Sequence, residues 1–222
     1  MSTALVIGAS RGIGREFVRQ LLADRWQVFA TARDDASIAE LNAAGATGLK
    51  ADVTQADSLA ALGWQLDGVA LDLAIYVAGV YGPRIDPSQS PSMADFDQVM
   101  HTNVLGAMQS IPLLAPMVES VNGQFVFISS GMGSIGDLQA GNGWLYRASK
   151  AALNMVVRAA ATSYPRATMI AMSPGWAKTD MGGADATITV EHSVSGMLRE
   201  LRRLTRGDTG TYINYEGRIL PW

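Results

Sequence analysis

Short apolar segments alternate with longer amphipathic segments along the chain. Ala4–Ile7 is a continuous apolar run that stops at a glycine, and such a run is typical of a strand buried on both faces. The next segment has apolar residues at helical spacing between Phe17 and Leu22, with arginines on its other side. The same alternation predicts strands at residues 27–31, near 51, 71–77, 124–129, 168–172 and 212–213, and helices at residues 34–41, 59–64, 95 onward, 146–163 and 194–204.

This order of elements predicts an α/β fold. Strands that alternate with helices, with no long linker between them, form one parallel sheet with helices on both faces. We therefore expect a single doubly wound domain over residues 1–222 with a seven-stranded parallel sheet. The long helical stretch after Asp95 contains Pro112 and Pro116, and we expect an interruption near one of them because proline lacks a backbone N–H.

Composition excludes several classes of protein and site. The 222 residues include no cysteine and only two histidines, so disulfides, thiol catalysis and zinc–thiolate sites are excluded and no metal is expected. The net charge of −3 provides no basic surface for nucleic acid. No apolar run approaches the roughly 18 residues of a membrane span, and no signal peptide is recognisable, so we expect a cytoplasmic protein without a membrane partner.

A glycine-rich loop follows the first predicted strand. It reads Gly8-Ala9-Ser10-Arg11-Gly12-Ile13-Gly14 and leads into the first predicted helix. Glycine lets the backbone turn tightly and approach a diphosphate, and a helix N-terminus presents free N–H groups and the positive end of its dipole. The alternative is a glycine-rich turn with no ligand. The strand–loop–helix context favours a Rossmann-type dinucleotide site, with cofactor contacts from Gly8, Ser10, Arg11, Gly12, Ile13 and Gly14.

The end of the second predicted strand bears on the choice of dinucleotide. NAD-binding chains usually place a carboxylate there, on the ribose 2′-hydroxyl. Here the strand ends in Thr31-Ala32-Arg33, and Arg11 lies in the glycine loop. We expect Arg11 and Arg33 to bind the 2′-phosphate, with no competing carboxylate on either, so NADP(H) is favoured over NAD(H). The alternatives are that both arginines are merely solvated and that Asp34, a helix-cap candidate, serves a ribose.

Two further strand ends offer cofactor contacts. Asp52 and Val53 follow the third predicted strand, where the carboxylate could accept a hydrogen bond from an adenine amino group or simply cap the next turn. Ala78 and Gly79 follow the fourth predicted strand, where backbone can approach a ligand. We include all four residues among the cofactor-binding candidates.

Tyr146 and Lys150 are the second chemical signal. They are four residues apart on a predicted helix, so both lie on one face, and Lys150 is one of only three lysines. An ammonium near a phenol lowers the phenol pKa from its usual value of about 10, which makes tyrosine a usable acid or base near neutral pH. The alternative is an ordinary amphipathic pair whose lysine extends to solvent.

Five motifs occur in the order typical of one enzyme family. They are the Gly8–Gly14 loop, Asn103 in His101-Thr102-Asn103-Val104, Ser129-Ser130, Tyr146-x-x-x-Lys150 and Ser173-Pro174-Gly175. With these motifs the chain resembles the short-chain dehydrogenases/reductases over essentially its whole length. The segments Tyr146–Asn154, Pro174–Gly183 and Gly217–Trp222 are most similar to the C-factor and Sniffer-type carbonyl reductase branch.

The resemblance implies four catalytic residues. Tyr146 would give a proton to a substrate carbonyl oxygen, and Ser130 would hydrogen-bond that oxygen. Lys150 would lower the pKa of Tyr146 and hold the nicotinamide ribose, while Asn103 would fix a water in a proton relay behind Lys150. Ser134 is the alternative catalytic serine, because Ser130 lies further before Tyr146 than the family serine does in many relatives.

The resemblance also extends the cofactor site and shows departures from the family pattern. Pro174, Gly175 and Thr179 would contact the cofactor, with Thr179 on the nicotinamide carboxamide, and Tyr146 and Lys150 complete the set. The family usually has threonine where this chain has Ile7, and two asparagines where it has Tyr76-Val77, which puts cofactor affinity in doubt. The short region after Pro174 implies a small or open substrate lid.

These features predict an NADPH-dependent oxidoreductase that transfers hydride between a nicotinamide cofactor and a carbonyl or alcohol substrate, with Tyr146 as general acid/base. An NAD-linked alcohol dehydrogenase is the alternative within enzymes. The alternative outside enzymes is a dinucleotide-binding signalling or sensor protein with weak or vestigial catalysis. Candidates for an apolar or aromatic substrate pocket, which could equally be core, are Tyr81, Met132, Leu138, Trp144, Trp176 and Met181.

The helix that follows Tyr146 carries many alanines, which allow close approach to the sheet or to another subunit. Relatives commonly pair through this helix and the long helix before the fifth strand, so we expect a homodimer or homotetramer with two-fold symmetry. The alternative is that the alanines face only the sheet. They are Ala148, Ala151, Ala152, Ala159 and Ala160.

Overall fold

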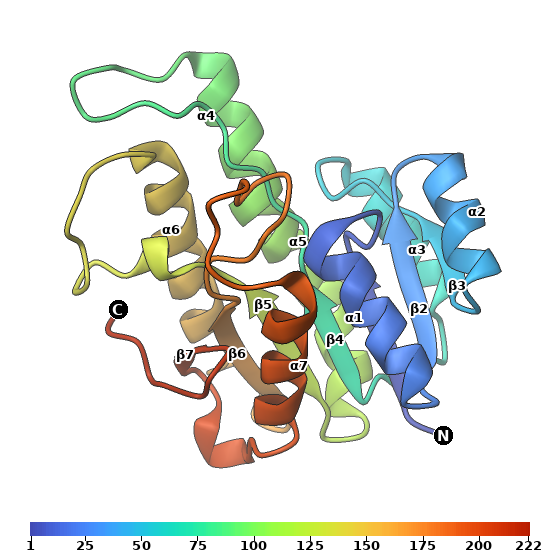
Figure 1. Ribbon diagram of the computed structural model, residues 1–222. Coiled ribbons are helices and arrows are strands. Elements are labelled where there is room, and N and C mark those ends of the chain that lie inside the picture. The colour runs from blue at the N-terminus through green and yellow to red at the C-terminus, as the bar shows by residue number, and fades with distance from the viewer.

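The computed structural model describes residues 1–222 and contains one sheet of seven strands (Figure 1). Across the sheet the order is β3-β2-β1-β4-β5-β6-β7, and every neighbouring pair is parallel. The predicted α/β fold with a doubly wound, seven-stranded parallel sheet is therefore confirmed. The strands are β1 (Thr3–Ile7), β2 (Gln27–Ala32), β3 (Thr47–Lys50), β4 (Leu73–Tyr76), β5 (Gln124–Ile128), β6 (Thr168–Ser173) and β7 (Tyr212–Asn214).

Helices cover both faces of the sheet, and in Figure 1 α1 and α7 lie in front of it while α5 and α6 lie behind. One apolar cluster joins the sheet to α1, α2 and α7, and a second joins it to α3, α5 and α6. The helices are α1 (Gly12–Ala23), α2 (Asp35–Ala43), α3 (Ala56–Gln65), α4 (Met93–Met100), α5 (Gly106–Glu119), α6 (Trp144–Ala160) and α7 (Val190–Leu201).

Strand β1 shows why these apolar runs form central strands. Successive side chains of a strand point to opposite faces, so Leu5 and Ile7 enter one cluster and Ala4 and Val6 enter the other. All four side chains are fully buried, because helices cover both faces of a parallel sheet. Full burial of one such large aliphatic side chain contributes about 1.5–3 kcal/mol.

The chain order across the sheet opens a crevice at one place. The chain builds β1, β2 and β3 in one direction, then returns to the other side of β1 to form β4. Connections that leave β1 and β4 in opposite directions make a crevice beyond the carboxyl ends of these two strands, which is where open α/β sheets bind ligands. The backbone N–H groups of Val77 and Ala78 both donate to the Ile7 carbonyl, at 2.9 and 3.0 Å, and hold the two strand ends together there.

The predicted interruption near Pro112 or Pro116 is wrong. Both prolines lie inside the continuous helix α5, and the departure from α-helical geometry is a π-helical turn over His101–Leu105, between α4 and α5. Pro112 and Pro116 are four residues apart on the exposed face of α5. The carbonyl groups that these prolines leave without a helical partner therefore face water, which satisfies them.

The predicted helix cap at Asp34 is confirmed. Its carboxylate accepts a hydrogen bond from the Ser37 backbone N–H at 2.8 Å at the start of α2. This hydrogen bond and a second one from the Ser37 hydroxyl hold the pKa of Asp34 below its usual range. No helix of the structure has the length and apolar character needed to cross a membrane.

Candidate active site

A cavity of about 420 Å³ lies at the carboxyl ends of β1, β2 and β4. Most of the predicted cofactor-binding residues line this cavity, and only Gly14 and Gly175 of that set do not. The structure therefore brings together residues from the glycine loop, three strand ends, α6 and the loop after β6. Those of the predicted set that line the cavity are Gly8, Ser10, Arg11, Gly12, Ile13, Arg33, Asp52, Val53, Ala78, Gly79, Tyr146, Lys150, Pro174 and Thr179.

The glycine loop has the backbone geometry of an anion cradle. Gly8 has a φ of +88°, and a Cβ there would lie 2.8 Å from the Ala78 nitrogen, so no larger residue fits. A Cβ on Gly14 would lie 2.1 Å from the Gly8 carbonyl oxygen, so Gly14 packs α1 against the loop and does not line the cavity. The backbone N–H groups of Gly12, Ile13 and Gly14 donate to no protein group, and no side chain caps the helix. They are free for a diphosphate.

The expectation that neither arginine has a competing carboxylate is wrong for Arg11. Its guanidinium forms an ion pair with Asp180, with Nη1 and Oδ2 3.0 Å apart, and both side chains are exposed. Asp180 follows β6 in the chain by several residues, so only the folding of that loop over the glycine loop makes this contact. Arg33 lies exposed beside the cavity and forms no ion pair.

Thr31 is a site residue that the sequence reasoning did not assign. Its hydroxyl accepts a hydrogen bond from the Gly8 backbone N–H at 3.0 Å, and the residue is buried at the end of β2. The family pattern has a threonine at the position of Ile7, directly before the glycine loop. In this chain the hydroxyl beside the loop comes from Thr31. The only signal in the sequence is a hydroxyl-bearing residue at the end of an apolar strand.

Asp52 caps a turn and also lines the cavity. Its Oδ1 accepts hydrogen bonds from the Thr54 backbone N–H at 3.0 Å and from the Thr54 hydroxyl at 2.8 Å. The turn-capping alternative is therefore correct. Asp52 also lines the same cavity as the glycine loop. Its contact with an adenine amino group therefore stays a prediction that is compatible with the structure.

Tyr146 and Lys150 lie on one face of α6, both almost fully buried. Burial raises the pKa of Tyr146 despite an opposing hydrogen bond with Ser130, so its phenol is protonated at neutral pH. The ammonium of Lys150 donates to the Ile128 carbonyl at 2.8 Å and lies 5.7 Å from the centre of the Tyr146 ring. Burial lowers the pKa of Lys150 to about 8. In this structure burial, and not the expected effect of Lys150, sets the direction of the Tyr146 pKa shift.

Asn103 lies in the π-helical turn and is fully buried. Its Oδ1 accepts from the Val80 backbone N–H at 2.8 Å, and its Nδ2 donates to the Val80 carbonyl and to the Ser149 hydroxyl, both at 2.9 Å. A Cβ on Gly79 would lie 3.3 Å from Asn103 Oδ1 and 3.4 Å from Lys150 Nζ. Both polar groups therefore lie close to Gly79, and a larger residue there would crowd them.

Tyr76 braces the turn that carries Asn103. Its hydroxyl donates to the Thr102 carbonyl at 2.8 Å, and the ring is fully buried between β4 and the turn. Burial raises the pKa of Tyr76, so the hydroxyl stays a donor. A Cβ on Gly106 would lie 2.5 Å from this hydroxyl, so the close fit depends on glycine at the start of α5. Tyr76 thus makes a structural contact at a position where the family pattern has asparagine.

The geometry separates the two candidate serines. Ser130 is half-buried and its side chain lies near the Tyr146 phenol, where it opposes the upward shift of the Tyr146 pKa. The Ser130 Oγ accepts a hydrogen bond from the Met132 backbone N–H at 3.1 Å. Ser134 is buried, donates to the Pro221 carbonyl at 2.6 Å and accepts from the Asp137 N–H at 3.0 Å. Of the two serines, only Ser130 affects the pKa of Tyr146.

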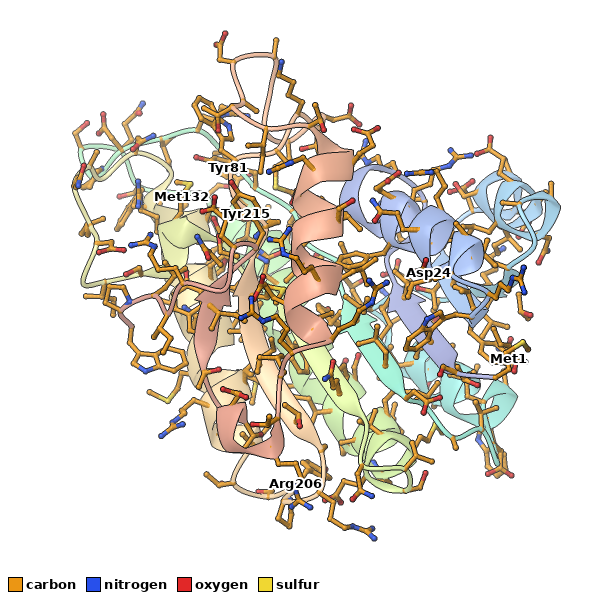
Figure 2. All side chains as sticks on the ribbon, turned by 60° about the horizontal axis from the view of Figure 1, so that its bottom comes forward. Met1, Asp24, Tyr81, Met132, Arg206 and Tyr215 are labelled. Atoms are coloured by element: carbon orange, nitrogen blue, oxygen red, sulfur yellow. The ribbon has the colours of Figure 1, made fainter.

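The predicted substrate-pocket residues separate into two groups. Tyr81 stacks on Tyr146, its hydroxyl lies 4.0 Å from the Met132 sulfur, and Met181 lines the cavity. Figure 2 shows Tyr81 and Met132 close together at the end of the sheet opposite Arg206. By contrast, Leu138 and Trp176 are exposed and do not line the cavity. The indole nitrogen of Trp144 is buried without a hydrogen-bond partner.

Arg84 crosses from the loop after β4 to the loop after β6. Its guanidinium lies 4.7 Å above the Tyr81 ring, and its Nη2 donates to the Met181 carbonyl at 2.9 Å. Together with the pair of Arg11 and Asp180, this contact holds the loop after β6 on both sides of the cavity.

Comparisons with known proteins agree with this geometry. A family model described as short chain dehydrogenase matches residues 2–187. A 1-hydroxy-2-glutathionyl-2-methyl-3-butene dehydrogenase of Rhodococcus sp. (strain AD45) is 32% identical over an alignment of 236 positions, which covers 100% of both chains. A short-chain dehydrogenase/reductase from Burkholderia multivorans with bound NADP is 35% identical, with a TM-score of 0.89, over 100% of this chain and 99% of that chain. A carbonyl reductase from Pseudomonas aeruginosa PAO1 in complex with NADP is 31% identical, with a TM-score of 0.87, over 100% of both.

Proposed function

The chain belongs to the short-chain dehydrogenase family of oxidoreductases, and on this premise we propose that it is an NADPH-dependent carbonyl reductase that acts as a single domain over residues 1–222. The observation that carries the proposal is the convergence of Ser130, Tyr146 and Lys150 beside a cavity lined by a glycine loop. A phenol that is protonated at neutral pH is suited to give its proton to a carbonyl oxygen.

The cavity fits a dinucleotide with a 2′-phosphate. The free N–H groups at the start of α1 suit the diphosphate, and Arg33 at the end of β2 is an unpaired cation near the expected ribose position. Arg11 reaches the same phosphate by leaving Asp180. Two of the similar solved structures contain NADP, which supports this choice over NAD(H). When bound, NADPH supplies the hydride that reduces the carbonyl carbon.

The residues of this chain supply the proton and the charge stabilisation. Tyr146 donates its phenolic proton to the carbonyl oxygen, and the Ser130 hydroxyl hydrogen-bonds the same oxygen as negative charge develops there. Lys150 places a cation behind the tyrosine and holds the nicotinamide ribose. Asn103 Oδ1 and Lys150 Nζ both approach Gly79, and a water bound by these two groups would return a proton towards Tyr146.

We assign substrate binding to the aromatic and methionine side chains on the Tyr146 side of the site. The ring of Tyr81 stacks on the Tyr146 phenol, Met132 contacts Tyr81, and Met181 lines the cavity, which favours an apolar or aromatic aldehyde or ketone. The loop after β6, held by the hydrogen bond from Arg84 to the Met181 carbonyl, covers this region and serves as the substrate lid.

We propose that the protein is a homodimer in which α5 and α6 of the two copies pack against each other. Helix α6 exposes Ala148, Met155 and Ala159, so its alanines do not face only the sheet. The adjoining face of α5 exposes Met108 and Pro112. A largely uncharged face of small and apolar residues on two neighbouring helices suits self-complementary pairing across a two-fold axis.

The proposed function is tested by NADPH consumption. The purified protein is mixed with NADPH and a panel of aliphatic and aromatic aldehydes and ketones, and loss of NADPH absorbance is followed together with formation of the alcohol. We expect turnover with at least one aromatic carbonyl and slower turnover with NADH. NADPH binding without any turnover would favour a dinucleotide sensor. The intact set of Asn103, Ser130, Tyr146 and Lys150 gives that alternative no support.

A further inference from the structure

The chain after β7 folds back along the same strand. The Leu220 N–H donates to the Tyr212 carbonyl at 2.8 Å, and Ile213 and Ile219 form an antiparallel bridge. Leu220 is buried in the apolar cluster of α5 and α6. Figure 1 shows the C-terminus beside the β7 edge of the sheet. We call residues 212–222 the C-terminal hairpin.

The end of this hairpin binds the segment that follows β5, residues 130–137, which we call the Ser130 loop. A main-chain oxygen of Trp222 accepts hydrogen bonds from the backbone N–H groups of Ile135 and Gly136, both at 2.8 Å. The Pro221 carbonyl accepts from the Ser134 hydroxyl at 2.6 Å. A Cβ on Gly136 would lie 2.9 Å from the Pro221 ring, so the two segments are in direct contact.

Tyr212 joins the hairpin to the catalytic serine itself. Its ring is almost fully buried and stacks on Trp222, with the ring centres 5.6 Å apart and the planes at 25°. Its hydroxyl donates to the backbone carbonyl of Ser130. Burial raises the pKa of Tyr212 to about 12, so this hydroxyl stays a donor throughout the working pH range.

The Ser130 loop needs such external support. It contains three glycines, Gly131, Gly133 and Gly136, and only one short 3₁₀ turn, so its own backbone restrains it weakly. A hydroxyl that stabilises a developing oxyanion must be held close to its productive position, and a misplacement of about 1 Å can cost roughly a hundredfold in rate.

We propose that Tyr212 and the C-terminal pair Pro221-Trp222 are positioning residues that hold Ser130 against Tyr146. The proposal rests on the carbonyl reductase function proposed above. None of the three residues lines the cavity. They act because Tyr212 fixes the peptide of Ser130 at one end of the loop, while Pro221 and Trp222 fix its other end through Ser134, Ile135 and Gly136.

The kinetic test is a double-mutant cycle between Tyr212 and Ser130. Tyr212→Phe removes only the hydroxyl and keeps the ring on Trp222. We expect it to lower kcat about tenfold to a hundredfold, with the Kd for NADPH and the thermal midpoint nearly unchanged. In a Ser130→Ala background the same change should alter kcat by less than about twofold, because no serine remains to be positioned. Tyr164→Phe, a half-buried tyrosine after α6, is the matched control.

The second readout needs no activity. We expect backbone amides of residues 132–138 to exchange with deuterium about tenfold faster in Tyr212→Phe, the equivalent of one hydrogen bond, and faster still in a chain that lacks Pro221 and Trp222. Unchanged exchange in Tyr212→Phe would overturn the proposal, as would a loss of kcat that is equally large with and without Ser130. If the wild-type protein reduces no carbonyl while exchange responds as expected, the proposed function fails and the positioning of the loop stands.

Discussion

The ring of Tyr81 lies nearly parallel to the ring of Tyr146, with the ring centres 4.6 Å apart and an angle of 19° between the planes. The guanidinium of Arg84 lies over the Tyr81 ring, 4.7 Å from its centre. The proposed acid is therefore one member of an aromatic stack that connects α6 to the loop after β4. This stack restricts both the orientation of the phenol and the direction from which a substrate can reach it.

Removal of the Tyr81 ring is expected to impair catalysis. An aromatic pair contributes about 0.5–1.5 kcal/mol beyond its buried area, so we expect Tyr81→Ala to lower kcat/KM by roughly 2- to 12-fold. Tyr81→Phe keeps the stack and should stay within about twofold of the wild type. Steady-state kinetics on both variants decides the matter, and equal loss in the two would mean that the hydroxyl, not the ring, is important.

Tyr146→Phe should abolish most carbonyl reduction and leave NADPH binding nearly unchanged. The phenyl ring preserves the packing and only the proton donor is lost, so kcat should fall by about 10²–10⁴-fold. Lys150→Ala should damage both kcat and NADPH binding, because the lysine has two proposed roles. Cofactor titration and single-turnover rates measure the two effects separately. Retention of more than about a tenth of wild-type kcat in Tyr146→Phe would exclude it as the general acid.

Cofactor preference should depend on Arg33 more than on Arg11. Arg33→Asp removes a charge-assisted contact and adds repulsion, so the Kd for NADPH should rise by roughly 10- to 150-fold while that for NADH changes little. Fluorescence titration with both cofactors measures this, with the exposed and distant Arg166→Asp as control. The same NADPH affinity in Arg33→Asp and in wild type would show that Arg33 does not meet the 2′-phosphate.

Asp180→Asn tests the other arginine. The substitution frees Arg11 from its ion pair, so NADPH should bind more tightly, by no more than about fivefold because exposed ion pairs are weak. NADH has no 2′-phosphate for the freed guanidinium, and its affinity should not change. Parallel titrations with the two cofactors provide the comparison, and a gain shared by NADH would contradict the assignment.

The buried ammonium of Lys150 should make stability depend on pH. Its pKa is about 8 in the folded protein and 10.5 when exposed, so the unfolded chain binds the extra proton between these values. Below pH 8 the folded protein carries the buried charge, which lowers its free energy of unfolding. As the pH rises from 8 towards 10.5, the folded protein has lost this proton while the unfolded chain still binds it, so the free energy of unfolding increases. We expect Lys150→Met to be more stable than wild type at pH 7, with the difference shrinking between pH 8 and pH 10. Urea unfolding at each pH measures this, with the exposed Lys178→Met as control.

The proposed dimer predicts a solution mass of about twice the 23.5 kDa of one chain. The double substitution Met108→Glu and Met155→Glu places charges on the exposed face of α5 and α6, so it should yield monomers. Trp64→Glu, at a more exposed apolar residue on α3, should leave the mass unchanged. Light scattering after size-exclusion chromatography distinguishes these results, and a monomeric wild type at micromolar concentration would count against the assembly.

Local pattern determined the elements and the presence of the chemistry. Strands such as β1 are apolar runs bounded by glycine, and helix α6 presents Tyr146 and Lys150 one turn apart, so each could be predicted from a few neighbouring residues. The glycine loop, the cap at Asp34 and the lack of a carboxylate at the end of β2 are equally local. Parallel pairing followed from the alternation of strands and helices, because parallel strands need crossover connections. The strand order across the sheet came from the tertiary structure.

Tertiary structure decided the contacts between distant segments. The ion pair of Arg11 with Asp180, the bond from Gly8 to Thr31 and the contact of Tyr212 with Ser130 join residues with no pattern in common. Their partners are chosen by which loops the fold brings together, and by the need of each buried polar group for a hydrogen bond.

The same reason accounts for the prolines and for the pKa of Tyr146. Helix α5 tolerates Pro112 and Pro116 because both lie on its exposed face, which only packing establishes. The spacing of Tyr146 and Lys150 indicated attraction between a cation and a phenol. Burial of both groups, a property of the whole fold, moved the tyrosine pKa upward and the lysine pKa downward. Spacing along the chain determines which groups can be neighbours, whereas the depth at which the fold places them determines how they titrate.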